Sequence, residues 1–172
     1  RGHVPRVVRM PGRDRLWRPH TPSIADLLAA GDRPLFSFEF FPPKDEIQQR
    51  QLWQAVRELE SLGPDFVPVT YGASGSTRDR TIKATEAIAQ HTTLRAMAHL
   101  TCASQSRDQL RRVVGWYAAA SIHHVLAIRG DMPGGPRVPW EAHPDGLDNA
   151  TELVAMVREL GDFCVGVAAF PD

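Results

Sequence analysis

The sequence predicts an α/β protein in which short parallel strands alternate with amphipathic helices. Beyond residue 33, short segments rich in β-branched and aromatic residues alternate with longer segments whose apolar residues recur three or four positions apart. Most of the short segments begin roughly thirty residues apart, a spacing typical of strand–helix–strand units. Apolar residues make up 42% of the 172 residues and charged residues 23%, which supplies a buried core and excludes a disordered chain.

Five segments are predicted as strands, and each connection between them is long enough to contain a helix. The segments are residues 35–41, 66–71, 96–101, 124–128 and 163–169. A helix between successive strands makes those strands parallel, with right-handed crossovers. We therefore expect one parallel sheet with helices packed against it.

Four helices are expected between these strands, three of them from apolar stripes with helical spacing. The stripes are Leu52, Val56 and Leu59; Leu110, Val113, Val114 and Tyr117; and Ala150, Leu153, Val154, Val157 and Leu160. A weaker helix over residues 81–90 has Ile82 and Ile88 as its apolar anchors. Ser106 and Asn149 each stand three residues before a Gln or Glu, the spacing of a helix N-cap and its capping partner.

Residues 1–33 are interpreted as a basic N-terminal extension with a short helix at its end, and residues 34–172 as a separate domain. The first 20 residues contain six arginines and one acidic residue and show neither helical nor strand periodicity. Three prolines in this stretch favour a flexible or strapping arm. A targeting peptide would also be rich in arginine, but this stretch has no serine and no amphipathic stripe.

The composition disfavours several classes of function. The 20 basic residues equal the 20 acidic ones, so nucleic acid is not an expected partner. Cys102 and Cys164 form no Cys-x-x-Cys pair, and the neighbouring His123 and His124 would face opposite sides of a strand, so we assign no metal. Two isolated cysteines fit a reducing compartment, and we expect a cytoplasmic location. No apolar run reaches the roughly eighteen residues that cross a bilayer, so no membrane partner is expected.

The strand ends distinguish a barrel from a doubly wound sheet. A doubly wound nucleotide-binding fold has a glycine-rich turn after its first strand, but residues 41–44 read Phe-Pro-Pro-Lys. Polar residues stand instead at the carboxyl ends of several strands, as they do in (βα)8 TIM barrels. We therefore expect such a barrel, of which this chain supplies about the first five βα units. Because five units leave two sheet edges unpaired, further residues or another chain should complete it. As protein partners we expect a second copy in a homo-oligomer, or a chain that completes the barrel.

Glu39 lies among aromatic residues in the first expected strand, which reads Phe-Ser-Phe-Glu-Phe-Phe over residues 36–41. Partial desolvation disfavours the charged form of a carboxyl group and suits a general acid at neutral pH. A glutamate bonded within a polar barrel interior is the alternative.

Thr70 and Tyr71 end the second expected strand. The small and hydroxyl-bearing residues that follow them either approach a ligand closely or form an ordinary loop.

The third and fourth expected strands also end in polar residues. His99 ends the third, either as a structural histidine or as a ligand contact. The fourth ends in Arg129, Gly130 and Asp131. The two charged residues form a salt-bridged pair, or they present a guanidinium and a carboxylate to a ligand whose close approach the glycine permits.

Taken in order, the strand-end sequences resemble the methylenetetrahydrofolate reductase family from about residue 35 to residue 172. The motifs are S-F-E-F-F-P-P at 37–43, V-T-Y-G-A-S-G-S-T-R-D-R-T at 69–81, A-H-L-T-C at 98–102, L-A-I-R-G-D at 126–131 and V-A-A-F-P at 167–171. The resemblance implies a (βα)8 barrel that binds FAD noncovalently and reduces 5,10-methylenetetrahydrofolate to 5-methyltetrahydrofolate with NADH or NADPH, in one-carbon metabolism and methionine biosynthesis. Two alternatives stay open: a non-catalytic or partial-subunit paralogue that binds folate or flavin, and a flavin-independent reductase of the same family.

The resemblance also implies roles for individual residues. The glutamate that matches Glu39 protonates a folate nitrogen as the five-membered ring opens, and the aspartate that matches Asp131 lies where flavin and pterin meet. Thr70 is implied in binding both folate and cofactor. Further cofactor contacts are implied for Tyr71, Ala73, His99, Arg129, Gly130, Asn149, Ala150 and Phe170. Asn149 and Phe170 stand where the family frequently has tyrosine.

Overall fold

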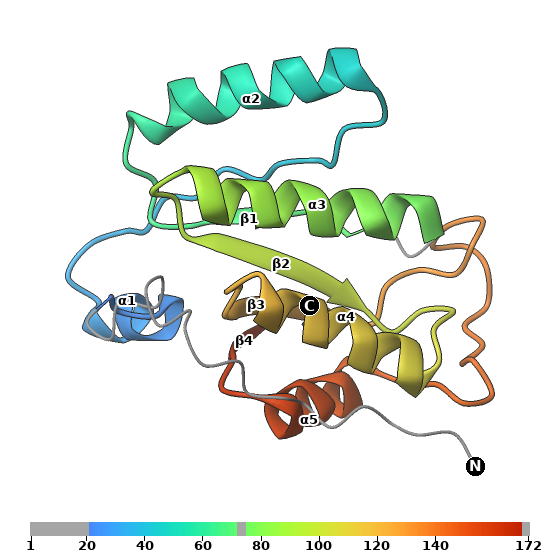
Figure 1. Ribbon diagram of the computed structural model, residues 1–172. Helices are drawn as coiled ribbons and strands as arrows, with labels where there is room; N and C mark the ends of the chain where they lie inside the picture. Colours follow the sequence, from blue (N-terminus) through green and yellow to red (C-terminus); the bar gives the residue numbers. More distant parts are fainter. Residues whose placement is uncertain (1–20, 72–74, 170–172) are drawn as a thin grey trace.

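The computed structural model describes residues 21–71 and 75–169, the side chains of residues 75–77 excepted. In chain order the elements are α1 (Ile24–Ala30), α2 (Glu46–Glu60), β1 (Val67–Val69), α3 (Gly75–His91), β2 (Ala96–Thr101), α4 (Arg107–Ala119), β3 (His124–Ile128), α5 (Ala150–Leu160) and β4 (Cys164–Val167) (Figure 1). None of the helices in these residues is long and apolar enough to cross a bilayer.

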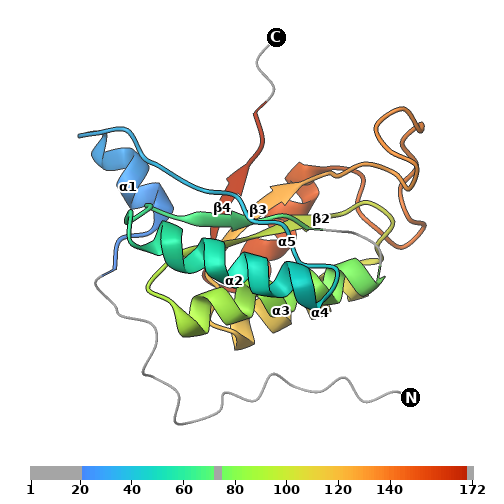
Figure 2. The same ribbon diagram turned by 90° about the horizontal axis from the view of Figure 1, so that it is seen from above.

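The four strands form one parallel sheet in the order β1-β2-β3-β4. The register pairs Val67 with Ala96, Met97 with His124, and His124 with Cys164. In a parallel sheet built in sequential order, right-handed crossovers place every connecting helix over the same face. Figure 2 shows α2, α3 and α4 together on one side of the sheet. The predicted α/β class and parallel sheet are confirmed.

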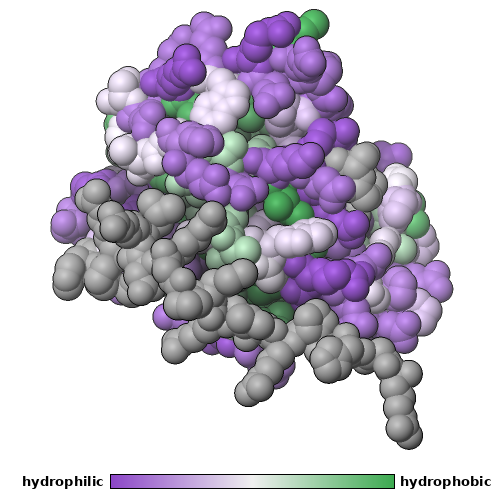
Figure 3. All heavy atoms as spheres, in the orientation of Figure 1, coloured by the Kyte–Doolittle hydropathy of each residue, from purple (hydrophilic) through white to green (hydrophobic). Residues whose placement is uncertain are grey.

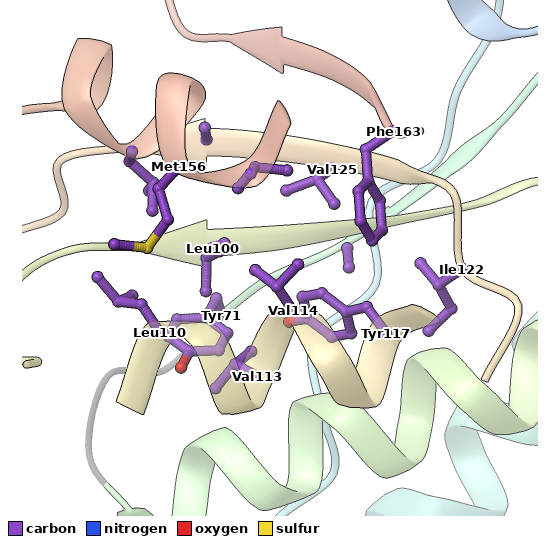
Figure 4. Packing of buried hydrophobic residues seen from close by; sticks show 14 of the residues in the cluster. Tyr71, Leu100, Leu110, Val113, Val114, Tyr117, Ile122, Val125, Met156 and Phe163 are labelled. Atoms are coloured by element: carbon purple, nitrogen blue, oxygen red, sulfur yellow. The ribbon is translucent and has the colours of Figure 1, made fainter. Parts of the chain in front are cut away.

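Apolar side chains fill the space between the sheet and its helices in two clusters. The larger cluster joins α4 and α5 to β2 and β3 (Figure 4), and its largest fully buried members are Tyr117, Leu100, Leu110, Ile122, Leu147 and Leu153. The smaller cluster joins α2 and α3 to β1 and includes Val56, Val67, Val69, Ala84 and Ile88. Because Ala98 and Leu100 of β2 belong to the core, the residues that alternate with them along the strand face the other side of the sheet.

The side chains that alternate with these core residues define the second face of the sheet, opposite the helices. They are Met97, His99 and Thr101 on β2, and His124, Leu126 and Ile128 on β3. Gly166 of β4 belongs to the same face, because a Cβ there would lie 2.9 Å from Met97 Cε. The polar residues at the end of β2 therefore point away from the hydrophobic core.

Residues 36–41 run parallel to β1 but do not form a continuous strand with it. They pair at two isolated bridges, of which the one beside Glu39 joins Phe40 to Val69. In a regular ladder continued from this pair, the amide of residue 68 would donate to the Phe38 carbonyl, and Pro68 has no N–H. The first predicted strand is therefore an interrupted edge segment.

Two further predictions differ from the structure, both in helices. α3 begins at Gly75 rather than at residue 81, although its opening Gly-Ser-Thr has low helix propensity. Leu160, predicted in the apolar stripe of α5, is 42% exposed, and Met156 is buried instead. Leu160 is the last residue of α5, where the chain turns through Gly161 toward β4.

An ion pair fixes the segment before residue 36 against the start of β1. Both terminal nitrogens of Arg33 donate to the buried Asp65 carboxylate, with Nη1 at 2.9 Å from Oδ2. The Phe36 amide donates to the same carboxylate at 2.8 Å. These donors, Arg33 above all, lower the pKa of Asp65 from 3.8 to about 2.

Asp65→Asn is expected to destabilise the full-length protein at neutral pH. Because the folded-state pKa lies below that of the unfolded chain, the ionised carboxylate stabilises the fold above about pH 4, and this contribution is lost as the pH falls toward about 2. Melting temperatures of wild type and variant should therefore differ at neutral pH and converge below about pH 4. Asp108→Asn, which removes an exposed pair with Arg111, is the matched control and should change the melting temperature little. A constant difference across the whole pH range would contradict this role of Asp65.

Candidate active site

Three polar side chains from neighbouring parts of the sheet converge on its second face. Glu39 comes from the segment beside β1, Thr70 directly follows β1, and His99 lies in β2. The Thr70 hydroxyl donates a hydrogen bond to Glu39 Oε1 at 2.6 Å, and His99 Nδ1 lies 4.0 Å from the same oxygen. The structure thus brings together three of the candidates taken from the sequence, which we call the Glu39 cluster.

Glu39 is accessible to solvent. Its side chain is 47% exposed, so the expected desolvation by surrounding aromatic rings is wrong. The reason is geometric: Phe40 points to the opposite face and joins the core, while Phe36 and Phe41 are 66% and 69% exposed. A ligand on the second face of the sheet can therefore reach the carboxylate directly.

His99 is buried, and burial lowers the pKa of its imidazole, an effect that the Glu39 carboxylate opposes. Burial therefore favours the neutral form of the ring. Within the described residues its Nε2 atom is buried without a hydrogen-bond partner, and so is the hydroxyl of Thr101, two residues along the same face of β2. Buried polar atoms without partners are uncommon in folded proteins, and a pair of them indicates a place where a polar ligand can bind.

The chain after β3 places Arg129, Gly130 and Asp131 beside the end of β2. The Arg129 guanidinium stacks on the Trp140 ring, 4.8 Å from its centroid. Gly130 has a φ of +80°, and a Cβ there would lie 2.7 Å from Thr101 Cβ, so the close approach that this glycine permits is to its own chain. Asp131 is exposed, and no ion pair in the described part of the chain joins it to Arg129, so these two residues are not a salt-bridged pair.

The remaining candidates do not join the Glu39 cluster. Tyr71 points into the core, where its hydroxyl donates to Gln105 Oε1 at 3.1 Å and burial raises its pKa to about 12. The Asn149 side chain caps α5 by accepting a backbone N–H of the first turn at 3.0 Å, and Ala150 is the first residue of that helix. The other two candidates, Ala73 and Phe170, lie outside the described residues.

In the part of the chain that the structure describes, the main surface grooves lie elsewhere than the Glu39 cluster. Grooves lie along α2, between α2 and α3, and beside His123 and Phe163, all away from the Glu39 cluster. In residues 21–71 and 75–169, no three His, Cys, Asp or Glu side chains come together in a way that could hold a metal ion. Figure 3 shows that the visible surface over α2 is mostly hydrophilic, as expected for the outer layer of an α/β fold.

A family model described as methylenetetrahydrofolate reductase matches residues 24–172 of the chain. The chain belongs to the methylenetetrahydrofolate reductase family. The match confirms the resemblance carried by the strand-end motifs. It begins at Ile24 and so includes α1, which lies within the segment interpreted from the sequence as an extension.

Curated methylenetetrahydrofolate reductases are similar over most of this chain. It is 44% identical over 138 residues to 5,10-methylenetetrahydrofolate reductase of Pectobacterium carotovorum subsp. carotovorum, covering 79% of this chain and 43% of that protein. Against the protein of the same name from Escherichia coli (strain K12), it is 41% identical over 136 residues, covering 79% and 44%. It is 35% identical over 149 residues to methylenetetrahydrofolate reductase (NADH) 1 of Zea mays, covering 85% of this chain and 25% of that protein. The chain spans less than half the length of these relatives.

Two residues of this candidate site are absent from the site residues proposed from the sequence. Thr101 stands two residues after His99, so the period of a strand is a sufficient signal that both side chains share a face. Trp140 lies in the long loop between β3 and α5, and no regular spacing relates it to Arg129. Its place beside the guanidinium comes from the folded path of the loop.

Proposed function

We propose that the full-length protein reduces 5,10-methylenetetrahydrofolate to 5-methyltetrahydrofolate, with NADH or NADPH as hydride donor and FAD as bound cofactor. The observation that carries the proposal is the Glu39 cluster, an accessible carboxylate held by Thr70 next to buried polar atoms of β2 that lack partners. Family membership supports the reaction, and the relative from Zea mays has NADH in its name.

The proposed architecture is a (βα)8 barrel in which residues 34–172 form about five of the eight units and residues 1–33 precede them. Support comes from the sequential order of the parallel sheet and the position of the helices over one face, since closing such a sheet encloses the other face. The Glu39 cluster would then lie at the carboxyl ends of the strands, where enzymes of this fold have their active sites.

The residues at the ends of β2 and β3 fit a flavin on chemical grounds. His99 Nε2 and the Thr101 hydroxyl can donate or accept hydrogen bonds, as the polar edge of a flavin ring requires. Arg129 adds a cation suited to an anionic group of the cofactor. Bound FAD would carry the hydride from the nicotinamide to the folate. Its other contacts are assigned to Thr70, Ala73, Gly130, Asp131, Ala150 and Phe170, whereas the side chains of Tyr71 and Asn149 are bonded elsewhere, in the core and at the start of α5.

Glu39 is assigned the proton transfer to the folate. Its acid form would donate a proton to the folate nitrogen as the carbon–nitrogen bond of the five-membered ring breaks, which leaves a carboxylate and an iminium carbon able to accept hydride. The Thr70 hydroxyl can donate to the carboxylate or accept from the acid, so this contact is available before and after the transfer. Burial favours the neutral imidazole of His99, and a neutral ring adds no positive charge that would favour the carboxylate. Asp131 is assigned to the pterin, whose N–H groups a carboxylate can bind.

The visible spectrum of the purified full-length protein tests this proposal. We expect the absorption of an oxidised flavin, which NADH or NADPH should bleach in the absence of oxygen and 5,10-methylenetetrahydrofolate should restore. Reduction of the folate by a protein without flavin absorption would support the flavin-independent reductase instead. Binding of flavin or folate without any turnover would support the non-catalytic paralogue.

A further inference from the structure

We infer that Thr70 is a positioning residue that sets the orientation of the Glu39 carboxylate toward the folate. The inference rests on the proposed function and adds, to the cofactor contact assigned to Thr70, a role that acts through Glu39. Because a positioning residue acts through another group, its loss should lower the rate of the folate step more than the affinity for folate.

The contact that carries the inference is a short hydrogen bond to an otherwise unrestrained group. Thr70 Oγ1 lies 2.6 Å from Glu39 Oε1, a usual length for a hydroxyl that donates to a carboxylate. Among the described residues this is the one hydrogen bond that the Glu39 carboxylate makes, while His99 Nδ1 stays at 4.0 Å. A glutamate that is 47% exposed has several rotamers open to it, so a single hydrogen bond selects among them.

The backbone N–H and the backbone carbonyl of Thr70 both make hydrogen bonds. Its amide donates to the Phe40 carbonyl at 2.9 Å, which ties Thr70 to the residue next to Glu39. Its carbonyl accepts the hydroxyl of Thr81, a fully buried residue of α3, at 3.0 Å. These two bonds fix Thr70 relative to the edge segment and to the helix behind the sheet. The backbone of Thr70 is therefore held in place, and its hydroxyl can orient the side chain of Glu39.

Two substitutions separate the hydrogen bond from packing. Valine has nearly the shape of threonine and the same restricted χ1, but it has no hydroxyl. Serine keeps the hydroxyl and loses the methyl group. If Thr70 positions Glu39, Thr70→Val should be impaired and Thr70→Ser should recover most of the wild-type behaviour.

The first measurement is the single-turnover rate at which 5,10-methylenetetrahydrofolate reoxidises the full-length protein previously reduced by nicotinamide. Thr70→Val should slow this step by about 10- to 100-fold, the range for loss of a hydrogen bond to a charged group, with little change in the folate concentration that gives the half-maximal rate. Thr70→Ser should remain within a few-fold of wild type. Thr92→Val is the matched control, because it removes a threonine hydroxyl bonded to a backbone carbonyl at the far end of α3, and it should leave the rate unchanged.

A double-variant comparison shows whether Thr70 acts through Glu39. In a Glu39→Gln background, Thr70→Val should slow the folate step by less than about twofold, because residues that act as one unit are not additive. Multiplication of the two effects would mean that Thr70 acts independently of Glu39, and it would overturn the inference. An unchanged folate rate in Thr70→Val alone would overturn it as well.

Crystal structures of the variants separate this inference from the proposed function. The Glu39 carboxylate should occupy one conformer in wild type and Thr70→Ser, and several in Thr70→Val. If the wild-type protein does not reduce the folate but this pattern is found, the proposed function fails and the role of Thr70 in orienting Glu39 stands. One unchanged Glu39 conformer in Thr70→Val would overturn that role.

Discussion

Glu39→Gln is expected to slow folate reduction by the full-length protein severely, while NADH or NADPH still reduces the bound flavin. Glutamine keeps the size of the side chain and an oxygen that can accept the Thr70 hydrogen bond, but it has no acidic proton to give. Loss of a general acid typically costs about 100- to 10,000-fold in rate. Rapid mixing of the reduced variant with 5,10-methylenetetrahydrofolate should therefore show a folate step slower by at least about 100-fold.

A glutamate on the outer surface provides the matched control for this substitution. Glu58 is an exposed residue of α2 that accepts a hydrogen bond from Gln54 within its own helix. Glu58→Gln makes the same chemical change far from the second face of the sheet, and both the nicotinamide and the folate steps should keep their wild-type rates. A folate rate in Glu39→Gln equal to that of Glu58→Gln would exclude Glu39 as the proton donor.

Gly130→Ala is expected to destabilise the full-length protein by about 2–5 kcal/mol, because it combines two costs. The φ of +80° is unfavourable for a residue with a side chain. The added Cβ would also lie 2.7 Å from Thr101 Cβ and 3.3 Å from the Cβ of Ala103, so the turn after β3 would have to move away from β2. Since Arg129 and Asp131 flank this glycine, the affinity for cofactor and folate should fall with the stability. Urea denaturation and ligand titration measure the two effects.

Gly135 is the matched control for the steric part of that prediction. It lies in the same loop with a φ of +97°, and a Cβ there would meet no atom within 4 Å. Gly135→Ala should therefore carry only the backbone cost of about 1–2 kcal/mol. Equal destabilisation by the two alanine substitutions would show that the packing of Gly130 against Thr101 contributes nothing.

The interior strands could be predicted from the sequence, whereas the edge segment could not. β2 and β3 have the predicted bounds because each is a short, mostly apolar run with polar or small residues on both sides. The N-caps at Ser106 and Asn149 follow from side-chain chemistry and spacing. The interruption beside β1 arises from the missing N–H of Pro68, which acts on the neighbouring segment and leaves no sign in the pattern of that segment.

For the candidate site, the sequence indicates which residues belong to it but not how they are arranged. Position at strand ends was sufficient to single out Glu39, Thr70 and His99. Their contact depends on the register between segments 31 positions apart, which a strand pattern does not specify. Tyr71 illustrates the limit: it directly follows Thr70, and because neighbouring residues point to opposite faces, its side chain enters the core.

The central claim is that the Glu39 carboxyl group faces the reacting folate. A crystal structure of the full-length protein with 5-methyltetrahydrofolate bound tests it most directly. We expect a folate nitrogen within hydrogen-bond reach of the Glu39 carboxyl group, and the Asp131 carboxylate on the pterin ring. A bound folate that neither carboxyl group approaches, or the two groups in separate cavities, would contradict the claim.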